Sequence, residues 1–252
     1  MEEPGFPDLV KYTNRACYLL SVGRPETQVA VYLPTTSLWM GDAKADKSEI
    51  AVAEQLLNTQ HDFDFVSEQA LATDLTLNKG EFVTASGTAY KAVIVPNITL
   101  MSDVVVHRLR AFAKAGGQVI FMDKLPEWLS GESILKSRPN TYTAKNYRWC
   151  RVQTGYTDFA YLINPDVKLQ KPTPVIKYTH RVIKDADIYF FFNESAEEQN
   201  NTVSITKTGF VHAWDAMTGN MTNEMGFKSG EYTNFEIKLK PHETRFYVVA
   251  KK

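Results

Sequence analysis

Residues 92–122 establish the architecture of this chain, and their sequence is AVIVPNITLMSDVVVHRLRAFAKAGGQVIFM. Two continuous apolar runs, at 92–96 and 119–122, enclose a segment with apolar residues at helical spacing. Ser102 suits the N-cap of that helix, and the two glycines before the second run suit its C-cap. Strands buried on both faces form continuous apolar runs, so this pattern predicts a parallel, doubly wound sheet with helices on its faces.

The segments before residue 92 continue the alternation of helices and strands. Apolar residues at helical spacing predict an entry helix at 8–22, ended by Gly23 and Pro25. Residues 75–77 and 81–83 predict a hairpin about the turn at 78–80. The remaining expected elements are a strand at 29–34, a polar loop through 42, a helix at 46–59, a strand at 63–66 and a short helix at 67–72.

From about Tyr147 the helical periodicity ends, and short alternating runs separated by Gly, Pro and Asn replace it. Their spacing predicts a C-terminal, all-β antiparallel sandwich. We therefore divide the chain into an entry helix (1–23), an α/β domain (24–138), a linker within 136–146 and a β-sandwich (147–252). The expected strands of the sandwich are 160–163, 175–181, 186–192, 202–206, 210–214, 235–239 and 244–250.

Composition and charge exclude several classes of protein. The 252 residues carry 28 Lys and Arg against 29 Asp and Glu, which gives a net charge of −1. This balance predicts neither nucleic acid nor an anionic membrane as a partner. With 44% hydrophobic and 23% charged residues, the composition is that of a folded globular protein. The first residues form no signal peptide, and no apolar segment is long enough to span a membrane.

The sequence has no pattern for a metal or a nucleotide, so we expect no cofactor. The two cysteines, Cys17 and Cys150, and the five histidines show no metal-ligand spacing, and no Gly-rich loop precedes a helix. A cysteine-nucleophile amidotransferase would suit the α/β pattern. Neither cysteine lies at a predicted strand-to-helix elbow, however, and no GxCxG motif occurs.

Ligands of doubly wound sheets bind beyond the carboxyl ends of the strands, which here means the loops at 35–42, 97–101 and 123–128. We expect these loops to share one rim. Trp39 and Trp128 are candidate stacking platforms for a sugar, and Asp42, Asn97 and Asp123 are candidate hydrogen-bonding groups. The competing interpretation, which we favour, is structural: loop aromatics wedge between domains, and an Asp after a strand caps a helix or turn.

His180 and Arg181 are neighbours in a predicted strand and therefore point to opposite faces. One of the two should be buried or at an interface, and a hydrogen-bonded structural histidine is the favoured interpretation. Trp214 and Asp215, followed by Gly219, predict a strand that ends in a tight turn, with a structural role for Asp215.

Several short motifs carry a resemblance that extends over nearly the whole chain. They are YTNRACYLLSVGRP (12–25), VAVYLP (29–34), IKYTHR (176–181), DADIYFFFN (185–193), WDAMTG (214–219) and LKP (239–241). In this order they resemble the region that follows the catalytic barrel in α-L-rhamnosidase-type glycoside hydrolases of family 106. The resemblance implies a flavodoxin-like, class I amidotransferase-like α/β domain, degenerate as in some β-galactosidases, with the β-sandwich packed beside it.

The same resemblance implies that the catalytic acids and any calcium site belong to an N-terminal barrel, so no catalytic residue is carried over. We expect the non-catalytic C-terminal part of a glycoside hydrolase, present as a cut piece or a short gene product, with the catalytic barrel as its partner. A parent enzyme of this type would be a bacterial periplasmic or cell-surface protein acting on plant polysaccharide.

Three functional hypotheses remain. The favoured one is an accessory scaffold that supports the barrel and lends a loop to its active site, which predicts an apolar docking patch. The second is an independent carbohydrate-binding module with exposed, coplanar aromatics, for which Trp214, Tyr178 and Tyr232 are the candidates. The third is an amidotransferase-like enzyme, which predicts a reactive thiol at Cys17 or Cys150.

Overall fold

A computed structural model of the chain describes residues 5–131, 134–141, 148–157 and 159–250. Its contacts divide the chain into two compact units. We call the first the β-rich unit; it contains residues 1–26, 57–61 and 165–252. The second, which we call the α/β unit, contains residues 27–56 and 62–164. Each unit is described separately.

The α/β unit is built on a five-stranded sheet in which every neighbouring pair runs parallel. This confirms the parallel sheet that the apolar runs predict. The three central strands are almost wholly buried, as continuous apolar runs require. In spatial order the strands are β3 (Phe63–Ser67), β2 (Val29–Leu33), β7 (Ala92–Val95), β9 (Gln118–Met122) and β12 (Arg151–Gln153).

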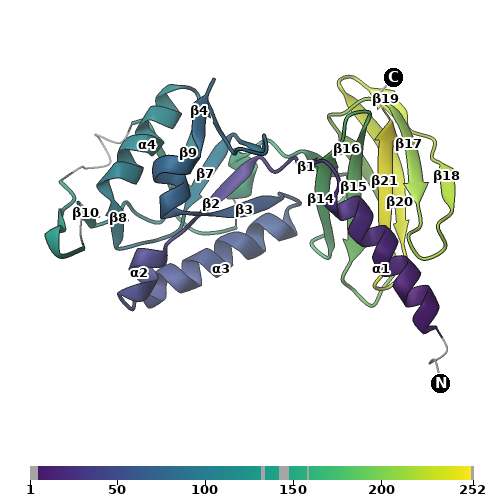
Figure 1. Ribbon diagram of the computed structural model, residues 1–252, viewed down its shortest axis with the longest axis horizontal. Helices are drawn as coiled ribbons and strands as arrows, with labels where there is room; N and C mark the ends of the chain where they lie inside the picture. Colours follow the sequence, from purple (N-terminus) through teal and green to yellow (C-terminus); the bar gives the residue numbers. More distant parts are fainter. Residues whose placement is uncertain (1–4, 132–133, 142–147, 158, 251–252) are drawn as a thin grey trace. The chain divides into compact units, whose positions relative to one another are not determined.

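Helices cover both faces of this sheet (Figure 1). On one face, Val52 and Leu56 of α3 (Ala43–Asn58) pack against the sheet. On the other, α4 (Asp103–Lys114) packs through Leu109 and Phe112. Ser102 occupies the N-cap position of α4 as expected, although its side chain makes no capping hydrogen bond.

Two small sheets extend the α/β unit. The expected hairpin is present as β4 (Thr76–Asn78) and β5 (Glu81–Val83), and β6 (Ala89–Tyr90) adds a third strand. Lys79 and Gly80 both have positive φ, at 47° and 82°, as a two-residue type I′ turn requires. In the second sheet, β10 (Trp128–Ser130) runs parallel to β8 (Leu100–Ser102) and antiparallel to β11 (Arg138–Pro139). The short helical turns are α2 (Thr35–Trp39), η1 (Ala70–Asp74), η2 (Ile134–Lys136) and η3 (Phe159–Leu162).

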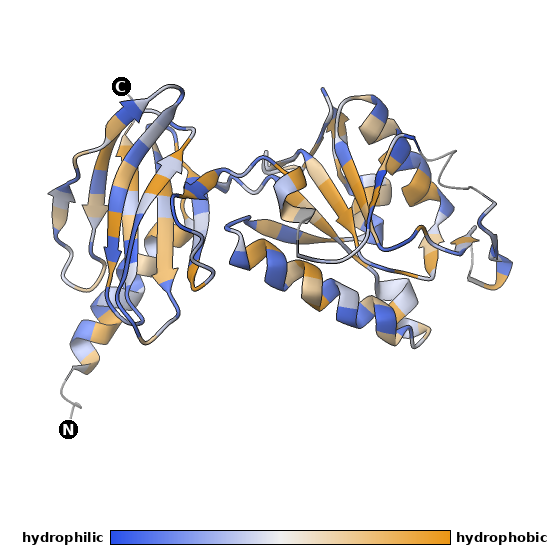
Figure 2. Cartoon of the chain, turned by 180° about the vertical axis from the view of Figure 1, so that it is seen from behind, coloured by the Kyte–Doolittle hydropathy of each residue, from blue (hydrophilic) through white to orange (hydrophobic). Residues whose placement is uncertain are grey.

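The β-rich unit consists of two antiparallel sheets that share one apolar core, and hydrophobic residues alternate along their strands (Figure 2). Tyr189 and Tyr247 of the larger sheet and Phe235 of the smaller sheet are almost fully buried in this core. The larger sheet has the order β1 (Arg24–Pro25), β14 (Ile176–Val182), β15 (Ala186–Asn193), β21 (Thr244–Ala250), β17 (Phe210–Trp214) and β18 (Met221–Asn223). The smaller has the order β13 (Val167–Leu169), β16 (Gln199–Ile205), β20 (Tyr232–Leu239) and β19 (Phe227–Ser229).

The entry helix, α1 (Phe6–Ser21), belongs to the β-rich unit and not to a separate segment. Ala16 and Leu19 pack against Ile188 and Phe246, on the face of the larger sheet opposite its main core. The helix thus shields a second apolar surface of this sheet from water. No helix among the residues described is both long and apolar enough to cross a membrane.

Two expectations for the middle of the chain differ from the structure. Residues 151–153 form the fifth strand of the parallel sheet, because they pair with β9, so the α/β unit extends to residue 164 and not to 138. Of the segment expected as a strand at 160–163, residues 160–162 lie in the 3₁₀ turn η3, and Ile163 follows it and packs on the α/β core. Of the expected linker, 142–146 lies outside the described residues, as does Tyr147, while Arg138–Pro139 form β11.

Candidate functional site

The loops after β2, β7 and β9 are tied together by hydrogen bonds, as the rim hypothesis predicts. Asp42 follows α2, and its Oδ2 accepts the backbone N–H of Thr99, beyond β7, at 3.0 Å. Asn97, also beyond β7, donates from Nδ2 to Oδ2 of Asp123 at 3.2 Å. Three of the predicted polar residues therefore lie on one rim of the α/β unit.

Asp42 has the capping role that we favoured for it. Its Oδ1 accepts the backbone N–H groups of Lys44 and Ala45, at 3.2 and 3.3 Å, in the first turn of α3. Partial burial opposes ionisation, but the hydrogen bonds from Thr99, Ala45 and Lys44 outweigh it and lower the pKa of Asp42. Asp42 is thus a carboxylate that joins the start of α3 to the loop after β7.

Asp123 is the centre of a second cluster on the rim. The backbone of Asp123 is left-handed, with φ at 59°, and Oδ1 accepts the N–H of Gly155 at 3.1 Å. Tyr156 donates its hydroxyl to Asp123 Oδ2 at 2.9 Å and also lies 2.8 Å from Ser48 Oγ. Burial and the Asp123 carboxylate raise the pKa of Tyr156, while the Ser48 contact lowers it less. Asp123 therefore holds the loop after β12 in place.

A cavity of about 400 Å³, which we call the rim pocket, opens beside Asp42. It unites two of the predicted site residues, Asp42 and Trp128. Trp39 lies outside its lining and is 81% exposed, while Trp128 is 42% exposed. Asn97 and Asp123 also lie outside it. The lining residues are Ser37, Met40, Gly41, Asp42, Thr99, Leu100, Trp128 and Ser137.

Trp214 lies in the β-rich unit, where the structure gives it a packing role. Its half-buried indole contacts the cluster formed with α1, and Nε1 donates to the carbonyl of Gly219 at 3.1 Å. Tyr178 is buried in the main core, and Tyr232 is half-buried beside Lys168. These three aromatics therefore do not form the exposed, coplanar platform expected of a carbohydrate-binding module.

A polar groove of about 480 Å³ also opens on the β-rich unit. Its aromatic residue, Tyr247, is only 2% exposed and offers no face to a sugar ring. Of its cations, Lys238 and Arg245 already pair with Glu198 and Glu243. The groove lacks an aromatic platform for a sugar and has no clear preference for one charge.

The cysteines provide no activated thiol. Burial raises the pKa of Cys150 to about 12, so this thiol stays protonated at neutral pH, whereas nucleophilic attack needs the thiolate. Cys17 is exposed on α1, in the β-rich unit, and not at a strand-to-helix elbow. The geometry thus argues against the amidotransferase hypothesis.

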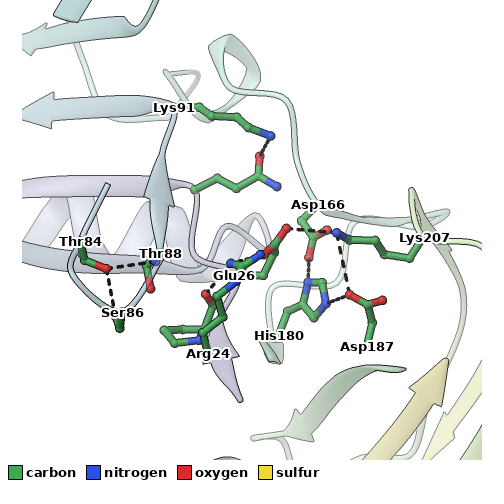
Figure 3. Close-up of polar contacts among 12 residues, drawn as sticks. Arg24, Glu26, Thr84, Ser86, Thr88, Lys91, Asp166, His180, Asp187 and Lys207 are labelled. Carbon is green, nitrogen blue, oxygen red and sulfur yellow. Dashed lines mark hydrogen bonds and ion pairs between the residues drawn. The ribbon is translucent and has the colours of Figure 1, made fainter. Parts of the chain in front are cut away.

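His180 is buried, as expected for one of the His180–Arg181 pair, and lies between two carboxylates (Figure 3). Its Nδ1 is 2.8 Å from Asp166 Oδ2, and its Nε2 is 3.0 Å from Asp187 Oδ1. Tyr189 stacks on the imidazole, with ring centroids 4.0 Å apart. Burial opposes protonation, but the hydrogen bonds to Asp166 and Asp187 outweigh it and raise the pKa of His180.

The surrounding ion pairs balance this cluster when His180 is an imidazolium. Lys207 lies 3.0 Å from Glu26 and 3.8 Å from Asp187, and Arg24 lies 2.5 Å from Glu26. Three cations then face three carboxylates, so the buried charges are compensated. Because His180 is only 1% exposed, the cluster is structural and not a reaction site. Among the described residues, no group of three or more His, Cys, Asp or Glu side chains is arranged to hold a metal ion.

The model of the α-L-rhamnosidase family, glycoside hydrolase family 106, matches residues 6–229, which is most of the chain. This chain belongs to that family. The match includes residues of both structural units and all the motifs that carry the resemblance except LKP (239–241). No curated protein matches the chain significantly.

Solved structures share the fold of this family 106 chain. A rhamnosidase from Novosphingobium sp. PP1Y aligns over 97% of the chain with a TM-score of 0.70 and 21% identity. An exo-carrageenase of family 42 from Bacteroides ovatus aligns over 97% of the chain with a TM-score of 0.59 and 13% identity. The α-L-fucosidase isoenzyme 2 from Paenibacillus thiaminolyticus aligns over 95% of the chain with a TM-score of 0.61 and 12% identity. The chain spans about a quarter (24%), a third (32%) and a half (51%) of these proteins.

Sequence reasoning located the rim of this family 106 chain but missed several of its residues. Ser37, Thr99 and Ser137 line the rim pocket, and Ser48 and Tyr156 complete the Asp123 cluster. Both Ser37 and Thr99 fall within the expected loops at 35–42 and 97–101, although Ser37 lies in the short helical turn α2. Nothing in the sequence indicates Tyr156 as a site residue. It lies 108 residues from Ser48 in the chain, and the strand that precedes it, β12, is too short to predict.

Proposed function

We propose that this chain is a non-catalytic accessory region of an α-L-rhamnosidase-type glycoside hydrolase that degrades polysaccharide, and that its natural partner is a catalytic barrel. The observation that supports it most is the family match over residues 6–229, in a chain that spans 24% of the Novosphingobium rhamnosidase. The larger part of that enzyme lies outside the matched region.

The carboxylates of the rim also support a non-catalytic role. Glycoside hydrolysis uses two carboxyl groups that flank the scissile bond, one of which is a general acid with a raised pKa. The rim pocket has one carboxylate, Asp42, and its pKa is lowered. Asp123, the neighbouring carboxylate of the rim, is hydrogen-bonded to Asn97, Gly155 and Tyr156. A proton donor and a second carboxylate are thus lacking in the lining of this pocket.

For the α/β unit we propose a flavodoxin-like, degenerate amidotransferase-like domain. In chain order its strands take the spatial arrangement 2-1-3-4-5, which is a common doubly wound order. The loops beyond the carboxyl ends contain no cysteine, and Cys150 packs on the core. The fold would then have been retained without nucleophilic chemistry. For the two antiparallel sheets of the β-rich unit we propose a β-sandwich.

An assay on an aryl α-L-rhamnoside tests the non-catalytic role. The purified chain should release no aryl alcohol above the uncatalysed rate, while the Novosphingobium rhamnosidase, as the positive control, should release it. Turnover by the chain that persists through purification and disappears on heat denaturation would refute the proposal. In that case Asp42→Asn and Glu224→Gln would show whether the rim pocket or the polar groove carries the activity.

A further inference from the structure

We infer that His180 is a pH-dependent anchor for residues 164–166, where the chain returns from the α/β unit to the β-rich unit. The protonated imidazole holds this return segment, and the neutral imidazole releases it. The chain passes between the two units after residues 26, 56, 61 and 164. His180 contacts Glu26 beside the first of these points and Asp166 beside the last, and all three residues belong to the β-rich unit.

The two contacts of His180 differ in their chemistry. Its backbone carbonyl accepts the N–H of Glu26 at 2.9 Å, and neither peptide group titrates. Its imidazole holds Asp166, whose Oδ2 lies 2.8 Å from Nδ1 (Figure 3). The contact to Glu26 therefore persists at any protonation state of the ring, whereas the contact to Asp166 depends on it.

Loss of the ring proton leaves three carboxylates facing two cations in a buried cluster. The titratable and charged groups around the imidazole are Asp166 before β13, Asp187 and Tyr189 of β15, Arg24 of β1, Glu26 after it, and Lys207 after β16. Burial raises the pKa of Tyr189 well above its ordinary value, so this phenol stays neutral. A neutral imidazole donates from one nitrogen, so either Asp166 or Asp187 then faces a nitrogen lone pair. A buried charge that loses its partner is strongly destabilising.

Asp166 is the carboxylate that can move away. Asp187 lies in β15 and is paired on both sides, with Val182 of β14 and Val249 of β21, and Lys207 is 3.8 Å away. Asp166 lies outside any strand, directly before β13, which is a three-residue strand at the edge of the smaller sheet. Its Oδ1 is buried and has no hydrogen-bond partner in the part of the chain that the structure describes. Release of the return segment thus breaks fewer backbone hydrogen bonds than any movement of Asp187.

Native-state hydrogen exchange of the full chain between about pH 6 and pH 9, expressed as protection factors, tests the inference. Residues 163–169 should lose protection at least about ten-fold as pH rises, which is the size expected for one charge-assisted hydrogen bond. The midpoint of this loss should coincide with the titration of the His180 ring, followed by NMR.

Two other crossing segments, 24–28 and 58–62, are internal controls. The first keeps the carbonyl of His180, and in the second Gln60 Nε2 donates to the carbonyls of Thr173 and Ile176, which do not titrate. Protection in both segments should change by less than about two-fold over the same pH range.

Three variants complete the test. His180→Gln carries no charge at any pH, so residues 163–169 should show the low protection of the alkaline protein throughout. Asp166→Asn should keep high protection throughout, because an amide accepts from an N–H and also donates to a bare ring nitrogen. His212→Gln, at a histidine of β17 in the same unit, should retain the pH dependence of the parent chain. Circular dichroism checks that each variant is folded.

Three outcomes would overturn the inference. The first is an unchanged protection of residues 163–169 between about pH 6 and pH 9. The second is an equal loss of protection in 24–28 and 58–62, which would indicate general loosening of the unit. The third is a His180→Gln chain that keeps the pH dependence of the parent. None of them affects the non-catalytic proposal, which only turnover of the aryl rhamnoside would refute.

Discussion

His180 and Asp187 are joined by a buried hydrogen bond of 3.0 Å between Nε2 and Oδ1, with both side chains at most 3% exposed. Because the other ring nitrogen faces Asp166, both nitrogens donate only when the ring is the doubly protonated imidazolium. The residues come from β14, β15 and the segment before β13, so the cluster joins three parts of the β-rich unit. Its charge state thus contributes to the stability of that unit.

The first prediction is a fall in stability as pH rises above 6.5. The pKa of His180 is raised in the folded chain above its ordinary value of 6.5, so its contribution is complete below 6.5 and is lost as pH rises through the folded pKa. His180→Gln should remove this decline from the urea midpoint of the β-rich unit. His212→Gln, a histidine of β17 paired with Asn223, is the control and should retain it. An unchanged profile for His180→Gln would contradict the prediction.

The acid side of the same profile should depend on Glu26. Burial opposes its ionisation, but the hydrogen bond and charge of Lys207 and the charge of Arg24 lower the pKa of Glu26 below 4.5. This contribution is complete above 4.5 and is lost as pH falls through the lowered pKa. Glu26→Gln should therefore reduce the slope of the urea midpoint against pH between about pH 5 and pH 3. Glu231→Gln, an exposed carboxylate of the same unit, should leave that slope as it is.

Arg181 should anchor the C-terminal end of α1. Its guanidinium donates to the carbonyls of Val22 and Gly23 at 2.7 and 3.0 Å, where unpaired helix-end carbonyls favour a cation. Arg181→Gln should destabilise the β-rich unit by roughly 1–2 kcal/mol and speed amide exchange in the last turn of α1. Lys228→Gln, at an exposed lysine of the same unit, is the control and should leave both the stability and the amide exchange unchanged. Unaltered exchange at residues 18–22 would be incompatible with this role.

Gly117 should tolerate no side chain, because of Phe112. A Cβ at Gly117 would lie 2.3 Å from Phe112 Cζ, and this buried ring is stacked on Phe82 at 4.4 Å. Gly117→Ala should therefore lower the unfolding free energy of the α/β unit by about 1–3 kcal/mol. Gly131→Ala, whose Cβ would meet its nearest atom at 3.8 Å, should change it by less than about 0.5 kcal/mol. Equal effects of the two variants would count against the packing argument.

The two cysteines should differ in their reaction with a thiol reagent at pH 8. Cys17 is exposed and should be labelled rapidly, whereas Cys150, with its pKa raised to about 12, should be labelled only after unfolding. In Cys17→Ser the native protein should thus show no rapid labelling. Rapid labelling of native Cys150 would revive the amidotransferase hypothesis.

Much of the fold could be predicted because its signals are local. The runs at 92–95 and 119–122 show which strands are buried on both faces, and the turn at 78–80 carries the residues that positive φ requires. The strands β17 and β21 begin and end where alternation places them. Short elements lack such signals: three residues at Arg151–Gln153 show no periodicity, and only pairing with β9 makes them a strand.

For the rim, the chain order of strands and loops was enough to place Asp42, Asn97 and Asp123 together, since parallel strands end at one edge. Periodicity and turn residues therefore determine the elements, their order and the location of a candidate site. Which side chains come together is decided by packing. On the rim, Trp128 and Asp42 line one pocket and Trp39 lies outside it. In the β-rich unit, His180 contacts Asp166 and Asp187. Hydrogen bonds and burial depend on distances between residues far apart in the chain, and those distances exist only once the sheets have formed.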